Sequence, residues 1–188
     1  MSGRLRRLVP AQLDEAQRKL YEAITGGERS KGAQHFPLTG DDGSLNGPFA
    51  IMLHAPLIGE ALQSLGSAVR FRTSLTDRCR EIAILHVAHE LGSEFEWWAH
   101  TRVGRAVGLS DEEVTALSVG EFRSSDPTEM AVSRLCANLL TSGTVADSEY
   151  EAMAEVLATA QVIEITTLVG YYRTLAQLMT VFDIGVPN

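Results

Sequence analysis

Apolar residues recur every three or four positions along most of the chain, which is the spacing of one face of an α-helix. A first stripe is formed by Leu13, Ala16, Leu20 and Ile24. Pro10 suits the first turn of this helix and Gly26 suits its end. The same spacing predicts long helices at 56–72, 77–91, 93–107, 127–140 and 160–182, and short ones at 48–54, 110–119 and 147–157. No long segment alternates with period two, so the predicted fold class is an all-α helical bundle.

Several predicted helices carry their own start signals. Thr76 is placed to cap the 77–91 helix, and Ser110 with Glu113 has the spacing of a capping box. The predicted core of the 56–72 helix is Leu57, Leu62, Leu65, Val69 and Phe71.

The 77–91 helix is apolar almost all round, and a helix of that kind is buried. It nevertheless contains Glu81, His86 and His89. Gly92 separates it from the next helix, on which Ser93, Glu96 and His100 share one face. The two helices could therefore gather two carboxylates and an imidazole around one small cavity.

A faint internal repeat is visible. The segment EIAIL at 81–85 returns as EITTL at 164–168, and each opens a long apolar helix. We therefore predict one domain over residues 1–188, built as a degenerate repeat of two helical modules at about 48–119 and 127–184. Between the first helix and these modules, residues 26–47 hold six glycines and form a long loop, which is either a lid over a pocket or a solvated connection.

Composition excludes some classes of partner. The net charge of −8 argues against nucleic acid, which needs a basic surface. The N-terminus has no apolar core of a secretory signal, and no apolar run approaches the roughly 20 residues of a membrane helix, so we expect a cytoplasmic protein without a membrane partner. Cys79 and Cys136 have no metal-type or CxxC spacing and are expected to be reduced thiols.

Each ionisable residue allows two interpretations. Glu81 is either solvated in a first helical turn or buried, where a low dielectric favours its neutral form. Glu96 and His100, four residues apart, are either an ordinary surface pair or an oriented general base. His86 and His89 could join Glu96 or His100 in a metal site, although no known metal signature is present.

One spacing is more specific. Glu81, eleven residues, Ser93, two residues, Glu96, three residues and His100 resembles the motif of the carboxymuconolactone decarboxylase and alkylhydroperoxidase D-like superfamily. Peroxidase-type members have cysteines at the two middle positions. The segments GSEFEWWAH and DDGSLNGPFAIMLHAPLIGEAL are similar to the cysteine-free, decarboxylase-like branch, and the resemblance covers about residues 37–115.

The resemblance implies a helical fold that assembles into trimers or hexamers. It also implies that the protein is a decarboxylase of a small lactone or carboxylic acid in aromatic-compound catabolism, and that it needs no cofactor. His100 would be the proton donor or oxyanion partner, with Glu96 orienting it or exchanging the proton. Glu81 would be a second acid or base across the pocket. The substrate would be a small molecule bound by Ser93, His86, His89 and Trp97. Where His86 stands, related decarboxylases more often have arginine, which holds a carboxylate more firmly.

Three alternatives stay open. The chain could be a non-catalytic helical oligomer that binds a small ligand. It could be a metal-dependent enzyme that uses His86, His89 and His100. A thiol peroxidase is the poorest option, because neither cysteine stands at a motif position.

Overall fold

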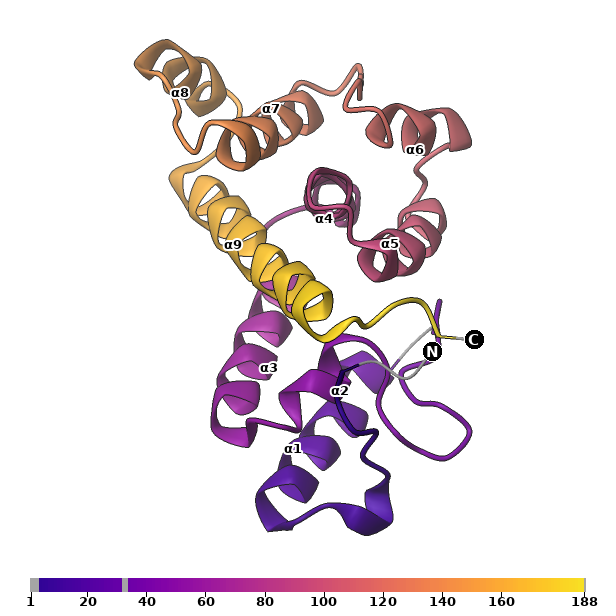
Figure 1. Cartoon of the computed structure of the whole chain (residues 1–188). Helices are drawn as coiled ribbons and strands as arrows, with labels where there is room; N and C mark the ends of the chain where they lie inside the picture. Colours follow the sequence, from indigo (N-terminus) through magenta and orange to yellow (C-terminus); the bar gives the residue numbers. More distant parts are fainter. Residues whose placement is uncertain (1–3, 32–33, 188) are drawn as a thin grey trace. The chain divides into compact units, whose positions relative to one another are not determined.

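The computed structural model describes residues 4–31 and 34–187, and regular secondary structure in these ranges is helical (Figure 1). The α-helices are α1 (Glu15–Thr25), α2 (Pro48–Met52), α3 (Pro56–Phe71), α4 (Asp77–Glu90), α5 (Glu94–Ala106), α6 (Asp111–Leu117), α7 (Pro127–Thr141), α8 (Asp147–Ala154) and α9 (Thr159–Phe182). Short 3-10 turns occur at Pro10–Gln12 and Glu28–Ser30. The predicted all-α class is confirmed. None of the described helices alone has the length and apolar character of a membrane span, and only α8 and α9, bent sharply against each other, meet both criteria as a pair.

Most helix ends follow their sequence signals. Ser110 and Glu113 form the predicted capping box, and the Thr76 hydroxyl accepts a hydrogen bond from the Cys79 amide. The first helix is the exception, because Pro10 opens only a 3-10 turn. The helix α1 begins at Glu15, where Asp14 caps it, so its predicted start was five residues too early.

The chain forms two compact units. One contains residues 4–72 and 174–187, and the other is Thr73–Arg173. The second unit holds α4 to α8 and the first part of α9. These units are distinct from the two predicted modules, and the repeat stays a prediction.

The helix α4 is the centre of the second unit. It contacts α5, α6 and α7, which Figure 1 shows arranged about it. Its apolar side chains from Ile82 to Leu85, with Val87, are fully buried. The prediction of a helix buried on every side is confirmed, and any polar group on α4 must therefore find a partner inside the protein.

The predicted inward face of α3 was largely wrong. Leu57, Leu65 and Phe71 are 84%, 39% and 41% exposed. The buried positions are instead Gly59, Gln63, Gly66 and Val69. A Cβ added to Gly59 would lie only 2.6 Å from the carbonyl oxygen of Met52. At Gly59 the neighbouring backbone therefore approaches α3 too closely for a larger side chain.

The described part of the long loop is held against the first unit. Tyr21 donates a hydrogen bond to the carbonyl of Gly43 at 2.9 Å, and Arg7 pairs with Asp42 at 2.9 Å. Hydrogen bonds from Arg7 and Ser44 hold the pKa of Asp42 well below its usual range. Ser44 is itself buried. These contacts tie the loop to the unit, although Asp41 and Asp42 are exposed and the solvated connection stays open. Residues 32–33 lie outside the described part of the chain, and the lid stays a prediction.

Candidate acid–base site

Glu81, Glu96 and His100 come together where α5 folds back on α4. Gly92 makes the turn with a φ of +59°, a conformation that favours glycine. His100 Nδ1 lies 2.6 Å from Glu81 Oε2, and its Nε2 lies 3.3 Å from Glu96 Oε2. The three residues, called the buried triad below, are each no more than 4% exposed. Glu81 is therefore buried and not solvated in a first helical turn.

The two carboxylates favour the protonated form of His100. Burial alone would lower its pKa, but the charge and hydrogen bond of Glu81, followed by those of Glu96, outweigh burial and raise the pKa. An imidazolium donates from both ring nitrogens, so it satisfies one oxygen of each glutamate. With both carboxylates ionised, the buried triad carries a net charge of −1.

One oxygen of the buried triad has no partner. Glu96 Oε1 is shielded from solvent and makes no hydrogen bond within the described structure. A buried carboxylate oxygen without a donor is costly, because its lost hydration is not replaced. Oε1 is therefore the atom of the buried triad at which one more hydrogen-bond donor would be stabilising.

The ring of His100 is also held by an aromatic contact. Tyr172 of α9 meets it edge-to-face with ring centroids 5.2 Å apart, and Tyr171 stands in the same relation to Tyr172. Both tyrosines are buried. Neither tyrosine was among the site residues predicted from the sequence. Their adjacency in an apolar helix, in a chain with only 6% aromatic residues, is the signal that could have found them.

The other predicted substrate contacts on α5 differ in burial. Ser93 stands at the N-cap of α5, but its side chain does not cap the helix. It is 6% exposed and lies one helical turn before Glu96. Trp97 is half-buried beside Glu96 in sequence. Their contact with a substrate stays a prediction.

The structure gives His86 a different partner. Its Nε2 lies 2.8 Å from the Ser133 hydroxyl on α7, and both side chains are buried. Burial, with a smaller contribution from His89, lowers the pKa of His86 to about 4. His86 is therefore neutral near pH 7 and cannot replace an arginine as a cation. His89 is half-buried near the end of α4. Substrate contact by either histidine stays a prediction.

The metal alternative receives no geometric support. Among the described residues, no group of three or more histidine, cysteine, aspartate or glutamate side chains is arranged to hold a metal ion. His86, His89 and His100 in particular form no such group.

The two cysteines are buried thiols. Cys79 is 2% exposed and Cys136 is fully buried. Burial raises the pKa of both thiols above the usual range. A thiol peroxidase needs a reactive thiolate. Neither cysteine is in the environment that would form one.

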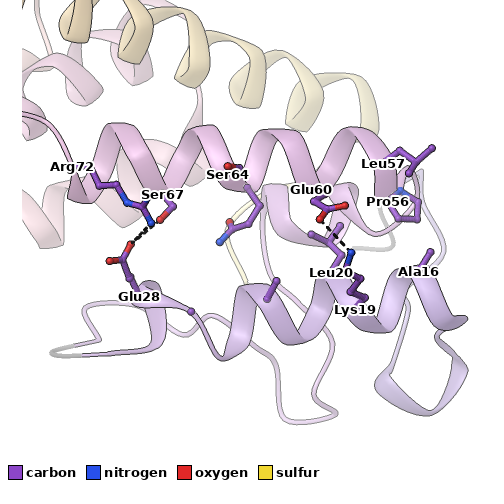
Figure 2. A pocket seen from close by; sticks show the side chains of 13 residues that line it. Ala16, Lys19, Leu20, Glu28, Pro56, Leu57, Glu60, Ser64, Ser67 and Arg72 are labelled. Carbon is purple, nitrogen blue, oxygen red and sulfur yellow. Dashed lines mark hydrogen bonds and ion pairs between the residues drawn. The ribbon is translucent and has the colours of Figure 1, made fainter. Parts of the chain in front are cut away.

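A separate pocket lies in the first unit. It has a volume of about 560 Å³ and runs along α1 and α3 (Figure 2). Figure 2 shows Lys19 paired with Glu60, 3.5 Å apart, and Glu28 beside Arg72, 3.8 Å apart. All four side chains are largely exposed, so these pairs contribute little. The residues lining this pocket do not include the buried triad.

Solved structures place this fold in a known class, the AhpD-like helical proteins. The alkylhydroperoxidase AhpD core protein of Ralstonia eutropha JMP134, an uncharacterized peroxidase-related protein, is similar with a TM-score of 0.77 and 14% identity, over 100% of this chain and 93% of that one. A peroxidase-related protein of Silicibacter sp. TM1040 has a TM-score of 0.75 and 11% identity, over 100% and 92%. The debrominase Bmp8, as a cysteine-to-alanine variant with 2,3,4-tribromopyrrole, has a TM-score of 0.72 and 11% identity, over 96% and 90%.

A comparison of sequences adds a match over part of the chain. Residues 56–137 match the carboxymuconolactone decarboxylase family, and this segment contains the whole buried triad. No curated protein sequence matches the chain. The chain therefore has the AhpD-like fold, and its segment 56–137 is similar to the carboxymuconolactone decarboxylase family.

Proposed function

We propose that the chain is an acid–base enzyme of the carboxymuconolactone decarboxylase type that acts on a small molecule without a cofactor. The observation that carries the proposal is the unpartnered Glu96 Oε1 beside a histidine held between two carboxylates. A buried carboxylate in contact with an imidazolium can exchange a proton at that oxygen. Such a group commonly contributes about 10²- to 10⁴-fold to a rate.

The geometry favours a different division of roles from the one that the resemblance implies. Both ring nitrogens of His100 are already engaged, so His100 has no free atom for the substrate. Glu96 is the group that meets the substrate, at Oε1. His100 holds a proton next to Glu96, and Glu81 fixes the orientation and charge of His100. Both act through Glu96 as positioning residues.

The specific reaction we propose is decarboxylation of a small lactone or related carboxylic acid in aromatic-compound catabolism. The bond to the carboxylate breaks, its electrons pass into a conjugated carbonyl, and the carbon left behind takes a proton. Overall one proton is consumed and one CO2 is released. The family match and the buried triad support this chemistry, which needs a fixed proton donor and no redox partner.

The test is a coupled assay of CO2 release and ultraviolet loss with 4-carboxymuconolactone and a panel of small carboxylic acids. We expect turnover by the wild type and a fall in kcat of about 10²- to 10⁴-fold in Glu96→Gln. The control is Glu94→Gln, which removes the same charge from an exposed site on the same helix and should leave turnover unchanged. Absence of turnover by the wild type with every acid would contradict the proposal.

A second candidate is a helical oligomer that binds a small ligand without converting it. The observation in its favour is that both ring nitrogens of His100 contact a glutamate, as those of a purely structural histidine would. Under this reading Glu96→Gln changes ligand affinity while no variant, nor the wild type, releases CO2. The same assay, run beside a thermal-shift screen, separates the two candidates.

A further inference from the structure

We propose that the ligand of the buried triad is a small molecule that presents an N–H or O–H donor to Glu96 Oε1 and carries at most one carboxylate. The inference rests on the proposed function, in that it assigns the molecule to the same site. It departs from the dicarboxylate substrate that the family name suggests. Its basis is the hydrogen bonding and charge of three buried side chains.

The first step concerns hydrogen bonding. His100 lies within reach of both glutamates, and an imidazolium in that position donates to each of them. Glu96 Oε2 lies 3.3 Å from His100 Nε2, whereas Oε1 has no hydrogen-bond partner in the described part of the chain. An ionised oxygen is an acceptor only, so the group that completes it must be a donor.

The second step concerns charge. Two carboxylates and one imidazolium leave a net charge of −1 in a place where each residue is at least 96% buried. Repulsion between like charges is stronger in such surroundings than in water. A ligand carboxylate close to Glu96 is repelled by this negative charge. In a small dicarboxylate the second carboxylate is also close to Glu96, so the repulsion is greater.

The third step concerns the residue that could have offset the repulsion. His86 occupies the position expected to hold a substrate carboxylate. It is neutral near pH 7 and bonded to Ser133 on another helix. It therefore supplies no positive charge for a dicarboxylate. The Ser93 hydroxyl, one turn before Glu96, is buried and not used in capping, which suits a polar uncharged group.

The test measures binding of matched neutral probes by ligand-observed NMR. Phenol is compared with fluorobenzene, and pyrrole with N-methylpyrrole, so that each pair differs mainly in the donor. A hydrogen bond to a charged acceptor predicts a preference of about 10- to 100-fold for the donor member in the wild type. Glu96→Met removes the acceptor and should abolish the preference, while the exposed control Glu94→Met should keep it.

The effect of ligand charge is tested with the monocarboxylate benzoate and the dicarboxylate terephthalate. Both should bind the wild type more weakly than phenol, and Glu96→Gln should strengthen both while weakening phenol. A role of Glu96 in folding alone would shift all probes in the same direction. Tighter binding of terephthalate than of phenol by the wild type would overturn the inference, and so would failure of both donor probes to bind.

The outcomes are separable from those of the activity assay. Glu96-dependent donor binding without turnover on any acid supports the inference and contradicts the enzymatic proposal. Turnover that depends on Glu96, combined with tight dicarboxylate binding, supports the enzyme and overturns the inference.

Discussion

At the scale of single residues, the charges of Glu81, Glu96 and His100 offset one another. His100 lies between two buried carboxyl groups, which raise its pKa and so favour its cationic form despite burial. Glu96 Oε1 is the one oxygen of this set left without a donor. The polar interior of α4 and α5 is thus stable only as a unit, and pH should act on it through His100.

The pKa of His100, raised in the folded state, predicts how stability depends on pH. Above the unfolded-state pKa near 6.5 the folded protein binds more protons than the unfolded chain, so the stabilisation is full below that pH and is lost as pH rises through the folded pKa. The free energy of unfolding should fall by up to about 1.4 kcal/mol per pH unit in this window. Urea unfolding of wild type and His100→Gln between pH 6 and 9 measures it, and only the wild type should show the slope. The exposed control His35→Gln should keep it; equal slopes in all three proteins would refute the assignment.

His86 should make the stability of the protein depend on pH in the acidic range, below the range in which His100 acts. Its pKa is lowered from 6.5 to about 4, so the unfolded chain takes up a proton first as pH falls. Its neutral form supports folding fully above pH 6.5, and this support disappears on the way to pH 4. The wild type should lose roughly 3 kcal/mol over that range beyond what His86→Gln loses, since glutamine keeps a partner for Ser133 without titrating. Parallel acid-unfolding curves for the two proteins would show that His86 is not held neutral.

The sequence predicted the triad but not all of its contacts. Glu96 and His100 are a helical pair visible from their spacing, and Gly92 marks the turn that returns α5 to α4. The contact with Tyr172 could not be read in the same way, because it joins residues far apart in sequence and depends on how helices pack. The same limit applies to His86, whose partner lies on α7.

At the scale of helices, Arg78 connects three of them. From α4 it forms a two-pronged ion pair with Glu129 of α7, with N–O distances of 2.6 and 3.0 Å. It also pairs with Glu113 of α6 at 2.7 Å and donates to the carbonyl of Gly108. Ser124 completes the coordination of Glu129 at 2.7 Å. This arrangement holds α6 and α7 on the helix that carries Glu81.

Removing Arg78 should therefore destabilise the second unit. In Arg78→Met, Glu129 is left 95% buried without its cation, and we expect a loss of about 2–4 kcal/mol in the free energy of unfolding. The control is Arg105→Met, which breaks an ion pair with Asp111 whose members are 50% and 79% exposed, and should cost less than about 1 kcal/mol. Chemical denaturation of both variants gives the comparison. Equal small losses would mean that the Arg78 network contributes no more than a surface pair.

Helix positions were largely predictable, but helix faces were not always so. Capping residues act locally, so Thr76 and Ser110 are readable from sequence. The face that α3 buries depends on how closely a neighbouring backbone approaches. Gly59 sits at that approach, and the leucine that an apolar pattern places inside, Leu57, is left exposed instead.

At the scale of the whole molecule, the exposed part of α3 suggests assembly. The second compact unit supplies the buried triad, and the family match extends upstream of it to residue 56, at the start of α3. Leu57 and Ile58 in this segment are 84% and 64% exposed. Large exposed apolar side chains close together commonly mark contact surfaces. The resemblance to oligomeric decarboxylases makes a second copy of the chain the occupant we expect.

We therefore predict that the 20.4 kDa chain is a trimer or hexamer in solution and that α3 contributes to the contact. The double variant Leu57→Glu, Ile58→Glu introduces charges that a desolvated interface cannot accommodate, while neither side chain is needed for the core of the chain. Light scattering coupled to size exclusion should give a multiple of 20.4 kDa for the wild type and a smaller mass for the variant. Thr166→Glu, which adds a charge at an exposed position of α9, serves as the control and should keep the wild-type mass. A monomeric wild type would refute the predicted assembly. An unchanged mass in the double variant would show that the interface lies elsewhere than on α3, because an interface on α3 could not accommodate two buried glutamates per copy.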